Sequence, residues 1–201
     1  MNNADSGIFY SAIHWSIPHL KTLLPPALYE RLHEAYCDPF SGIIDTTTIY
    51  NSASGEVLKE LVMPGMIRID RNRMRALCSE GLAIHYSKAF SGLKYGADGQ
   101  GVTISFADGT SAEGDIVVGA DGPQSDVRTE LLGKDAAASK PSNLVSFMST
   151  VNYKDAEKAR HVRSGNRIFC MGCNPAGIMN FISGKFGSAA LNFFSNWIVK
   201  N

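Results

Sequence analysis

The chain has 201 residues, of which 44% are hydrophobic and 19% are charged, a composition that suits a globular protein with a sizeable core. Its 19 basic and 19 acidic residues cancel, so no excess charge favours binding to nucleic acid or to an anionic membrane. No apolar run approaches the roughly 20 residues that span a bilayer, and the first residues lack the basic and apolar parts of a signal peptide. We therefore expect a cytoplasmic protein without a membrane span, whose four cysteines are reduced thiols.

Two helices are expected near the start of the chain. Residues 14–24 place apolar side chains on one helical face and end at Pro25-Pro26. Because proline is tolerated in a first turn, a second helix is expected from that pair to about Tyr36. A strand at residues 49–50 followed by a turn and a second strand at residues 56–63 come next.

A third helix is predicted over residues 71–80 by several local signals. Asp70 is a candidate N-cap, Met74 and Leu77 lie on one apolar stripe, and Gly81 stands where a helix commonly ends.

Alternating apolar and polar residues then predict a β-meander over residues 83–118. Asp98-Gly99 and Asp108-Gly109 are its expected hairpin turns, and His85 is expected to face outward from a strand. A short helix is predicted at residues 124–132. Residues 135–143 are a small, polar connector, and two further strands are predicted at 144–153 and 167–173 in a second layer or domain.

The segment that could carry chemistry is GDIVVGADGPQSDVR, residues 114–128. Residues 116–118 form an apolar run typical of a strand buried on both faces, and the glycines after it let the backbone bend and approach a ligand. Asp121 then stands at the carboxyl end of the strand, where its carboxylate suits the hydroxyls of a ribose. The alternative is a tight Asp-Gly turn capped by its own aspartate, with Arg128 paired to Asp126 or to the next turn. Spacing alone leaves both interpretations open.

This segment resembles the DG motif of flavin-dependent aromatic hydroxylases, the p-hydroxybenzoate hydroxylase-like group of monooxygenases. The match covers the apolar run, the pair Asp121-Gly122, Ser125 and Arg128. In that family the motif helps to place FAD and the reduced nicotinamide cofactor. The resemblance implies that Asp121 and Gly122 help to hold FAD, and that Ser125 and Arg128 lock the loop or touch the nicotinamide nucleotide.

A second segment, IDRNRM at residues 69–74, is similar to the family's short hydrophobic-x-Arg-x-x-Leu segment, with Met74 in place of leucine. The resemblance implies that Arg71 contacts the flavin. A guanidinium at the positive end of a helix is unfavourable unless an anion lies nearby, which agrees with such a role. The alternative is a solvated surface arginine.

Two family features are not matched in this sequence. It contains no G-x-G-x-x-G fingerprint, the turn that binds the FAD pyrophosphate at a helix N-terminus, and no counterpart of the family's later Gly-Asp segment. Cys170 and Cys173 have the spacing of half a zinc site, but no second pair follows. We expect packed thiols there and no metal site.

The resemblance implies an α/β (α+β) fold. Residues 1–135 would form an incomplete FAD-binding Rossmann-like sheet with an inserted β-meander, and residues 136–201 would begin a β-sheet substrate domain. The implied function is that of an FAD-dependent monooxygenase, which uses NAD(P)H and O₂ to hydroxylate or epoxidise a small organic metabolite in fungal secondary metabolism. The alternative is an inactive remnant or subunit that binds FAD only with a partner chain that completes its sheet. The residues do not identify the substrate.

Overall fold

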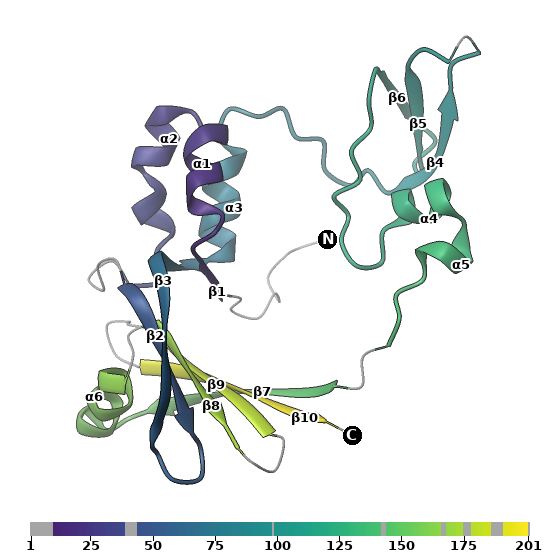
Figure 1. Ribbon diagram of the computed structural model, residues 1–201. Helices are drawn as coiled ribbons and strands as arrows, with labels where there is room; N and C mark the ends of the chain where they lie inside the picture. Colours follow the sequence, from purple (N-terminus) through teal and green to yellow (C-terminus); the bar gives the residue numbers. More distant parts are fainter. Residues whose placement is uncertain are drawn as a thin grey trace. The chain divides into compact units, whose positions relative to one another are not determined.

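The computed structural model describes residues 10–38, 44–97, 99–141, 144–165, 168–174, 178–185 and 191–200. Contacts divide the chain into two units, a smaller one of residues 83–142 and a larger one of residues 2–82 and 143–201 (Figure 1). The smaller unit is therefore inserted into the sequence of the larger one. The predicted domain boundary at residues 135 and 136 stays a prediction. Within the described ranges, no helix is both long and apolar enough to cross a bilayer.

Three α-helices and one 3₁₀ helix of the larger unit pack against the end of strand β3 (Val57–Asp70). They are α1 (Ile17–Leu23), α2 (Pro26–Glu30), the 3₁₀ helix η1 (Leu32–Ala35) and α3 (Arg71–Ser79). The second predicted helix thus has its proline in the first turn, as expected, but it is interrupted at Arg31 and continues as η1. The apolar core between these helices and the strand consists of Leu32, Ala35, Ile67, Ile69 and Leu77.

The sheet of the larger unit has seven strands in the order β1-β3-β2-β8-β9-β10-β7. Neighbouring strands are antiparallel except β2 and β8, which pair in parallel at Ile49 and Met171. The strands are β1 (Tyr10–Ile13), β2 (Ile44–Asn51), β3 (Val57–Asp70), β7 (Leu144–Tyr153), β8 (Phe169–Cys173), β9 (Ile178–Lys185) and β10 (Leu191–Lys200).

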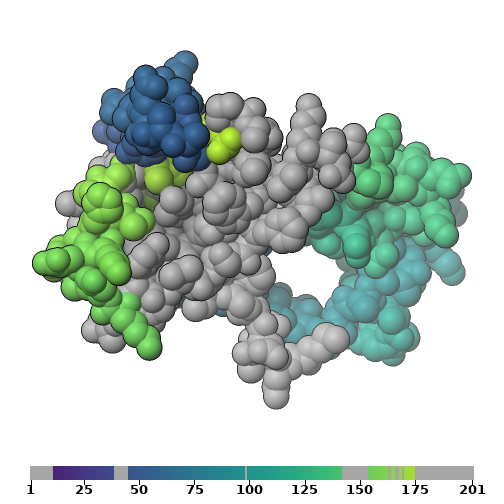
Figure 2. All heavy atoms as spheres, turned by 90° about the horizontal axis from the view of Figure 1, so that it is seen from below, coloured from purple at the N-terminus to yellow at the C-terminus, as the bar shows by residue number. Residues whose placement is uncertain are grey.

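The strands predicted in this unit are confirmed, and two of them are longer than expected. β2 begins at Ile44, and β3 runs without a break to Asp70, where α3 starts. Helix α6 (Ala156–Gly165) follows β7. In the space-filling view, the β2–β3 hairpin (blue) and α6 (light green) both reach the surface (Figure 2).

The smaller unit contains the predicted meander as three antiparallel strands, β4 (Phe90–Tyr95), β5 (Val102–Phe106) and β6 (Ser111–Gly114). The turn before β6 forms as expected. The carboxylate of Asp108 accepts hydrogen bonds from Lys88 Nζ at 2.6 Å and from the amide of Thr110 at 3.0 Å, and Gly109 has a φ of 82°. At the other predicted turn, Asp98 lies outside the described residues.

Helix α4 (Asp126–Leu132) confirms the short helix predicted at residues 124–132. The predicted connector at residues 135–143 is only partly irregular, because α5 (Lys134–Ala137) occupies its beginning. The side chains of Val127 and Ala137 are buried, so both short helices contribute apolar groups to the core of this unit.

Two predictions about strands in this unit are wrong. His85 does not lie on a strand, because the meander begins only at Phe90, and its side chain is exposed in the preceding irregular segment. Residues 116–118 do not form a strand buried on both faces. The side chains of Ile116 and Val118 are each 81% exposed, and among the described residues no neighbouring strand pairs with this segment.

Candidate functional site

Two glycines allow the segment after β6 to turn back onto α4. Gly119 lies so close to the helix that a Cβ on it would be 2.8 Å from both Cβ and Cγ1 of Val127. Gly122 has a φ of 91°, a left-handed conformation that side chains disfavour, and nothing lies within 4 Å of where its Cβ would be. The first glycine therefore permits close packing, and the second permits the turn itself.

The carboxylate of Asp121 caps the start of α4. Its Oδ1 accepts a hydrogen bond from the Ser125 hydroxyl, and its Oδ2 accepts from the amides of Asp126 at 2.8 Å and Val127 at 3.2 Å. These donors, the Ser125 hydroxyl above all, lower the pKa of Asp121 below its usual range. The carboxylate is therefore ionised at neutral pH, and the loop is held to the first turn of the helix.

Ser125 also links the loop to the helix, because its hydroxyl accepts a hydrogen bond from the helix while it donates one to Asp121. Its hydroxyl oxygen accepts from the amide of Arg128 at 2.9 Å, and its carbonyl accepts from the Thr129 hydroxyl at 2.9 Å. The side chain is only 6% exposed. Ser125 is thus the N-cap of α4 and, through Asp121, the centre of a hydrogen-bonded unit.

Arg128 fastens the loop to α5. Its Nε donates to the carbonyl of Ala137 at 3.1 Å, and its Nη2 donates to the carbonyl of Pro123. The hydroxyl of Ser139 donates to the same Pro123 carbonyl at 3.0 Å. The guanidinium therefore pairs with backbone carbonyls rather than with Asp126, the partner that the turn interpretation suggested. Pro123 and Ser139 are participants that the motif did not reveal, because a backbone carbonyl and a distant hydroxyl leave no signature in a short pattern.

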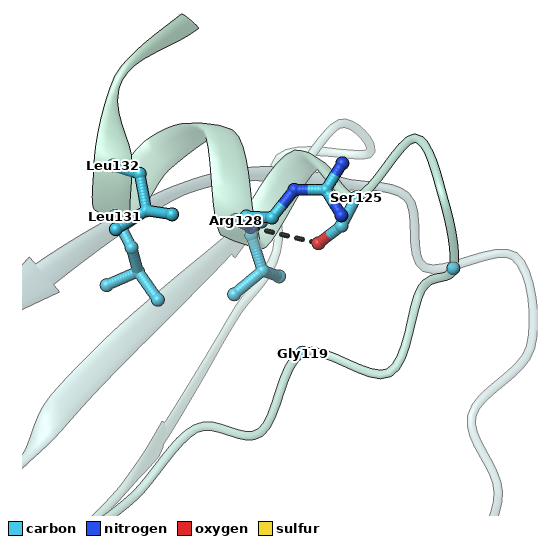
Figure 3. A pocket seen from close by; sticks show the side chains of 7 residues that line it. Gly119, Ser125, Arg128, Leu131 and Leu132 are labelled. Atoms are coloured by element: carbon cyan, nitrogen blue, oxygen red, sulfur yellow. Dashed lines mark hydrogen bonds between the residues drawn. The ribbon is translucent and has the colours of Figure 1, made fainter. Parts of the chain in front are cut away.

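A cavity of about 340 Å³ lies beside this loop, at the lower end of the sizes typical of ligand pockets. Figure 3 shows Ser125 and Arg128 joined by a hydrogen bond from the Arg128 amide to the Ser125 hydroxyl, with Leu131 and Leu132 farther along the same helix. Its lining residues are Gly119, Gly122, Ser125, Val127, Arg128, Leu131 and Leu132. Val127 and Leu131 were not predicted, although their spacing of four residues on a helix places them on one face. The loop thus places a guanidinium and exposed backbone beside an apolar wall.

Of the five predicted cofactor-binding residues, the structure brings together Asp121, Gly122, Ser125 and Arg128. Arg71 lies in the larger unit, as the first residue of α3, and its side chain is exposed. The carboxylate of Asp70 caps this helix by accepting from the amides of Asn72 at 2.9 Å and Arg73 at 3.1 Å, as predicted. The carboxylate of Asp70 thus lies at the positive end of the α3 dipole. A flavin contact by Arg71 stays a prediction.

The cysteine pair lies on β8, with Cys170 opposite Ile182 and Cys173 opposite Met179. Burial raises the pKa of the Cys170 thiol, which disfavours the thiolate that binds metals. All four cysteines are free. Across the described parts of the chain, no three His, Cys, Asp or Glu side chains gather in a way that could hold a metal ion.

Two curated fungal proteins have similar sequences. The chain is 37% identical over 164 residues to the FAD-dependent monooxygenase phnB of Penicillium herquei, covering 80% of this chain and 40% of that protein. It is 32% identical over 172 residues to the FAD-dependent monooxygenase cctM of Talaromyces islandicus, covering 85% and 42%. The chain therefore spans about four tenths of the length of these relatives. No family model matches the sequence.

Solved structures share the fold at low sequence identity. A putative FAD-containing monooxygenase from Photorhabdus luminescens superposes with a TM-score of 0.66 at 23% identity, covering 98% of this chain and 54% of that one. A salicylate hydroxylase in a substrate complex gives a TM-score of 0.68 at 15% identity, with coverage of 96% and 48%. The predicted α/β fold class is confirmed by these neighbours, apart from the strand expected at residues 116–118. Sequence and fold thus both confirm the resemblance to flavin-dependent monooxygenases, over somewhat less than half the length of their curated fungal members.

Proposed function

We propose that this chain supplies the FAD-holding loop and part of the substrate-domain sheet of an FAD-dependent monooxygenase. The observation that carries the proposal is the loop itself. Asp121, Gly122, Ser125 and Arg128 are held in one hydrogen-bonded arrangement beside a cavity, and the sequence around them matches proteins named FAD-dependent monooxygenases. FAD would supply the oxygen-transfer chemistry, and the chain would bind and orient it.

The residues at the loop fit such a group. Gly122 leaves its backbone open, because nothing lies within 4 Å of a Cβ at that position, so a ligand can approach the main chain. Arg128 places a guanidinium along the cavity, a group that suits the phosphate part of a nucleotide, and Ser125 holds the backbone beside it. We assign these residues and Arg71 to cofactor binding.

Asp121 contributes in a different way. A carboxylate has about four acceptor sites, and donors from Ser125, Asp126 and Val127 already occupy three of them. Little capacity is left for a ribose hydroxyl. We therefore assign Asp121 mainly to positioning, because it holds the backbone of Gly122 and the hydroxyl of Ser125 where a cofactor can meet them.

We also propose NAD(P)H as the reductant and a small organic metabolite of a secondary-metabolite pathway as the substrate. The fungal relatives support the class of enzyme, and a structural neighbour from Klebsiella pneumoniae, described as complexed with FAD and uric acid, supports a small-molecule substrate. A second hypothesis, a subunit that binds FAD only together with a partner chain, is favoured by the exposure of Ile116 and Val118.

Flavin titration of the purified chain tests the proposal. We expect added FAD to lose fluorescence as it binds and the bound flavin to be bleached at 450 nm by NADPH. Ser125→Ala should weaken FAD binding about tenfold, because it removes the hydroxyl that orders the loop. Ser164→Ala is the matched control, since Ser164 also makes one backbone hydrogen bond, to His161 at 2.7 Å on α6. A folded chain that leaves FAD fluorescence unchanged at millimolar flavin would contradict the first hypothesis and favour the second.

A further inference from the structure

Arg128 carries a positive charge that no carboxylate among the described residues neutralises. Its side chain is half-buried and takes part in none of the ion pairs found there. Its Nε donates to the carbonyl of Ala137 and its Nη2 to the carbonyl of Pro123, so the two N–H groups of Nη1 have no acceptor in the described parts of the chain. A guanidinium held in this way keeps donors for an oxyanion.

The guanidinium is also the charged group of the cavity beside the loop. Among the described residues that line this cavity, Arg128 is the only charged one. In Figure 3 its side chain extends toward the first turn of α4 and away from Leu131 and Leu132. How the two backbone carbonyls hold the guanidinium therefore decides how it meets an anionic ligand there.

Ser139 connects the two carbonyls that hold Arg128. It follows Ala137 closely in the sequence, and its hydroxyl reaches back sixteen residues to donate to the carbonyl of Pro123 at 3.0 Å. A carbonyl oxygen has two lone pairs, and Arg128 and Ser139 supply two donors to this one. Because the proline ring fixes φ, a carbonyl bound by two donors has little freedom to turn. Ser139 thus ties one acceptor of the guanidinium to the segment that carries the other.

We propose that Ser139 is a positioning residue for the cofactor. Its hydroxyl holds the Pro123 carbonyl near the end of α5, which fixes the plane of the Arg128 guanidinium and keeps its remaining donors where a phosphate oxygen of the cofactor can accept them. Without this hydroxyl the guanidinium would be less firmly held, and phosphate binding would then cost the entropy of ordering it. The inference rests on the proposed function of the loop and adds a residue outside the DG-like segment.

Nitrogen-15 NMR of the flavin-free full chain tests the positioning directly. The Nε–H signal of Arg128, identified by its loss in Arg128→Lys, reports how firmly the guanidinium is held. We expect its exchange with water to be about fivefold faster in Ser139→Ala, whereas Ser139→Thr keeps the hydroxyl and should restore the parent rate. Thr22→Val is the matched control, because Thr22 also donates its hydroxyl to a proline carbonyl, that of Pro18 at 3.1 Å, but on α1. Unchanged exchange in Ser139→Ala, or an equal increase in Thr22→Val, would overturn the proposal.

Flavin titration then separates positioning from a general loss of stability. Ser139→Ala should weaken FAD binding about fivefold, and Ser139→Thr should restore it. Gly109→Ala strains a turn in the same unit, where the φ is 82°, and should leave FAD affinity unchanged. A Ser139→Ala chain that binds FAD as tightly as the parent, or equal weakening by Gly109→Ala, would overturn the inference. A parent chain that binds no FAD would instead contradict the proposed function, and the exchange rates would still decide whether Ser139 positions Arg128.

Discussion

At the scale of single residues, Gly119 and Gly122 owe their places to different physical requirements. Gly119 has no room for a Cβ because Val127 is in the way, whereas Gly122 has room but adopts a backbone conformation that side chains disfavour. The sequence predicted both as flexible points for approach to a ligand. That interpretation does not account for Gly119, because its neighbour Val127 comes from a helix whose packing a local pattern cannot show.

We expect the two glycines to respond differently to replacement by alanine. Gly122→Ala should lower the free energy of unfolding by about 1–2 kcal/mol, from backbone strain alone. Gly119→Ala should cost about 2–3 kcal/mol, because Val127 must move. Gly109→Ala is the control, since Gly109 lies in the same unit, has a φ of 82° and has nothing within 4 Å of a Cβ. Urea unfolding monitored in the smaller unit, by the amides of β4 and β5, measures the difference. Equal losses at positions 119 and 122 would contradict the steric role of Val127.

Asp121 makes the stability of the loop depend on pH in the acidic range. Because hydrogen bonds lower the pKa of this carboxyl in the folded chain, its contribution is fully present above the unfolded pKa, near 4. The contribution is lost as the pH falls through the lowered value. Ser125→Ala removes the largest cause, so the pKa of Asp121 should rise toward its ordinary value. Carbon-detected NMR titration of the Asp121 carboxyl from pH 7 to about 2 measures its pKa in the parent chain and in the variant. A pKa that does not rise in the variant would show that the two amides suffice to hold it.

At the scale of elements, α3 shows how far local signals reach. The cap at Asp70, the stripe of Met74 and Leu77 and the stop at Gly81 all lie within one short window, and the predicted helix is confirmed. Residues 116–118 show the limit. Their apolar run predicts a strand, but a strand also needs a neighbouring strand to pair with. Which segment pairs with it depends on residues far away in the sequence, so the segment alone does not predict it.

Loss of the cap should destabilise α3. Asp70→Ala removes the acceptor for two backbone amides, so the free energy of unfolding should fall by about 1 kcal/mol. Asp70→Asn keeps a capping oxygen and should lose much less. Urea unfolding followed by circular dichroism measures the change. An Asp70→Ala chain as stable as the parent would mean that packing of Leu77 alone holds the helix.

The contacts of the candidate site also divide into some that the local sequence predicts and some that it does not. The DG-like pattern predicted which side chains meet, and the structure joins Asp121, Ser125 and Arg128 around one turn. It did not predict that Arg128 reaches the Ala137 carbonyl, nine residues away, since α5 was expected to be part of a connector. Contacts between consecutive short elements depend on where the chain turns, which composition does not specify.

At the scale of the whole molecule, the division into two units predicts that damage to one stays local. Gly119→Ala should increase hydrogen exchange in β4 and β5 of the smaller unit, while the amides of β2 and β3 in the larger unit keep their protection. Exchange measured at neutral pH on the parent and the variant checks this. A uniform rise across both units would show that they unfold as one cooperative body.

The parallel pairing of β2 with β8 also has a consequence for the newly synthesised chain. Ile49 pairs with Met171, so the whole smaller unit and β7 are translated between the two strands. At roughly 5–20 residues per second, one edge of β2 waits on the order of ten seconds for its neighbour. The loop around Asp121 is complete before then. During each round of translation, the cell must therefore keep an unpaired strand edge from aggregating while the loop around Asp121 is already made.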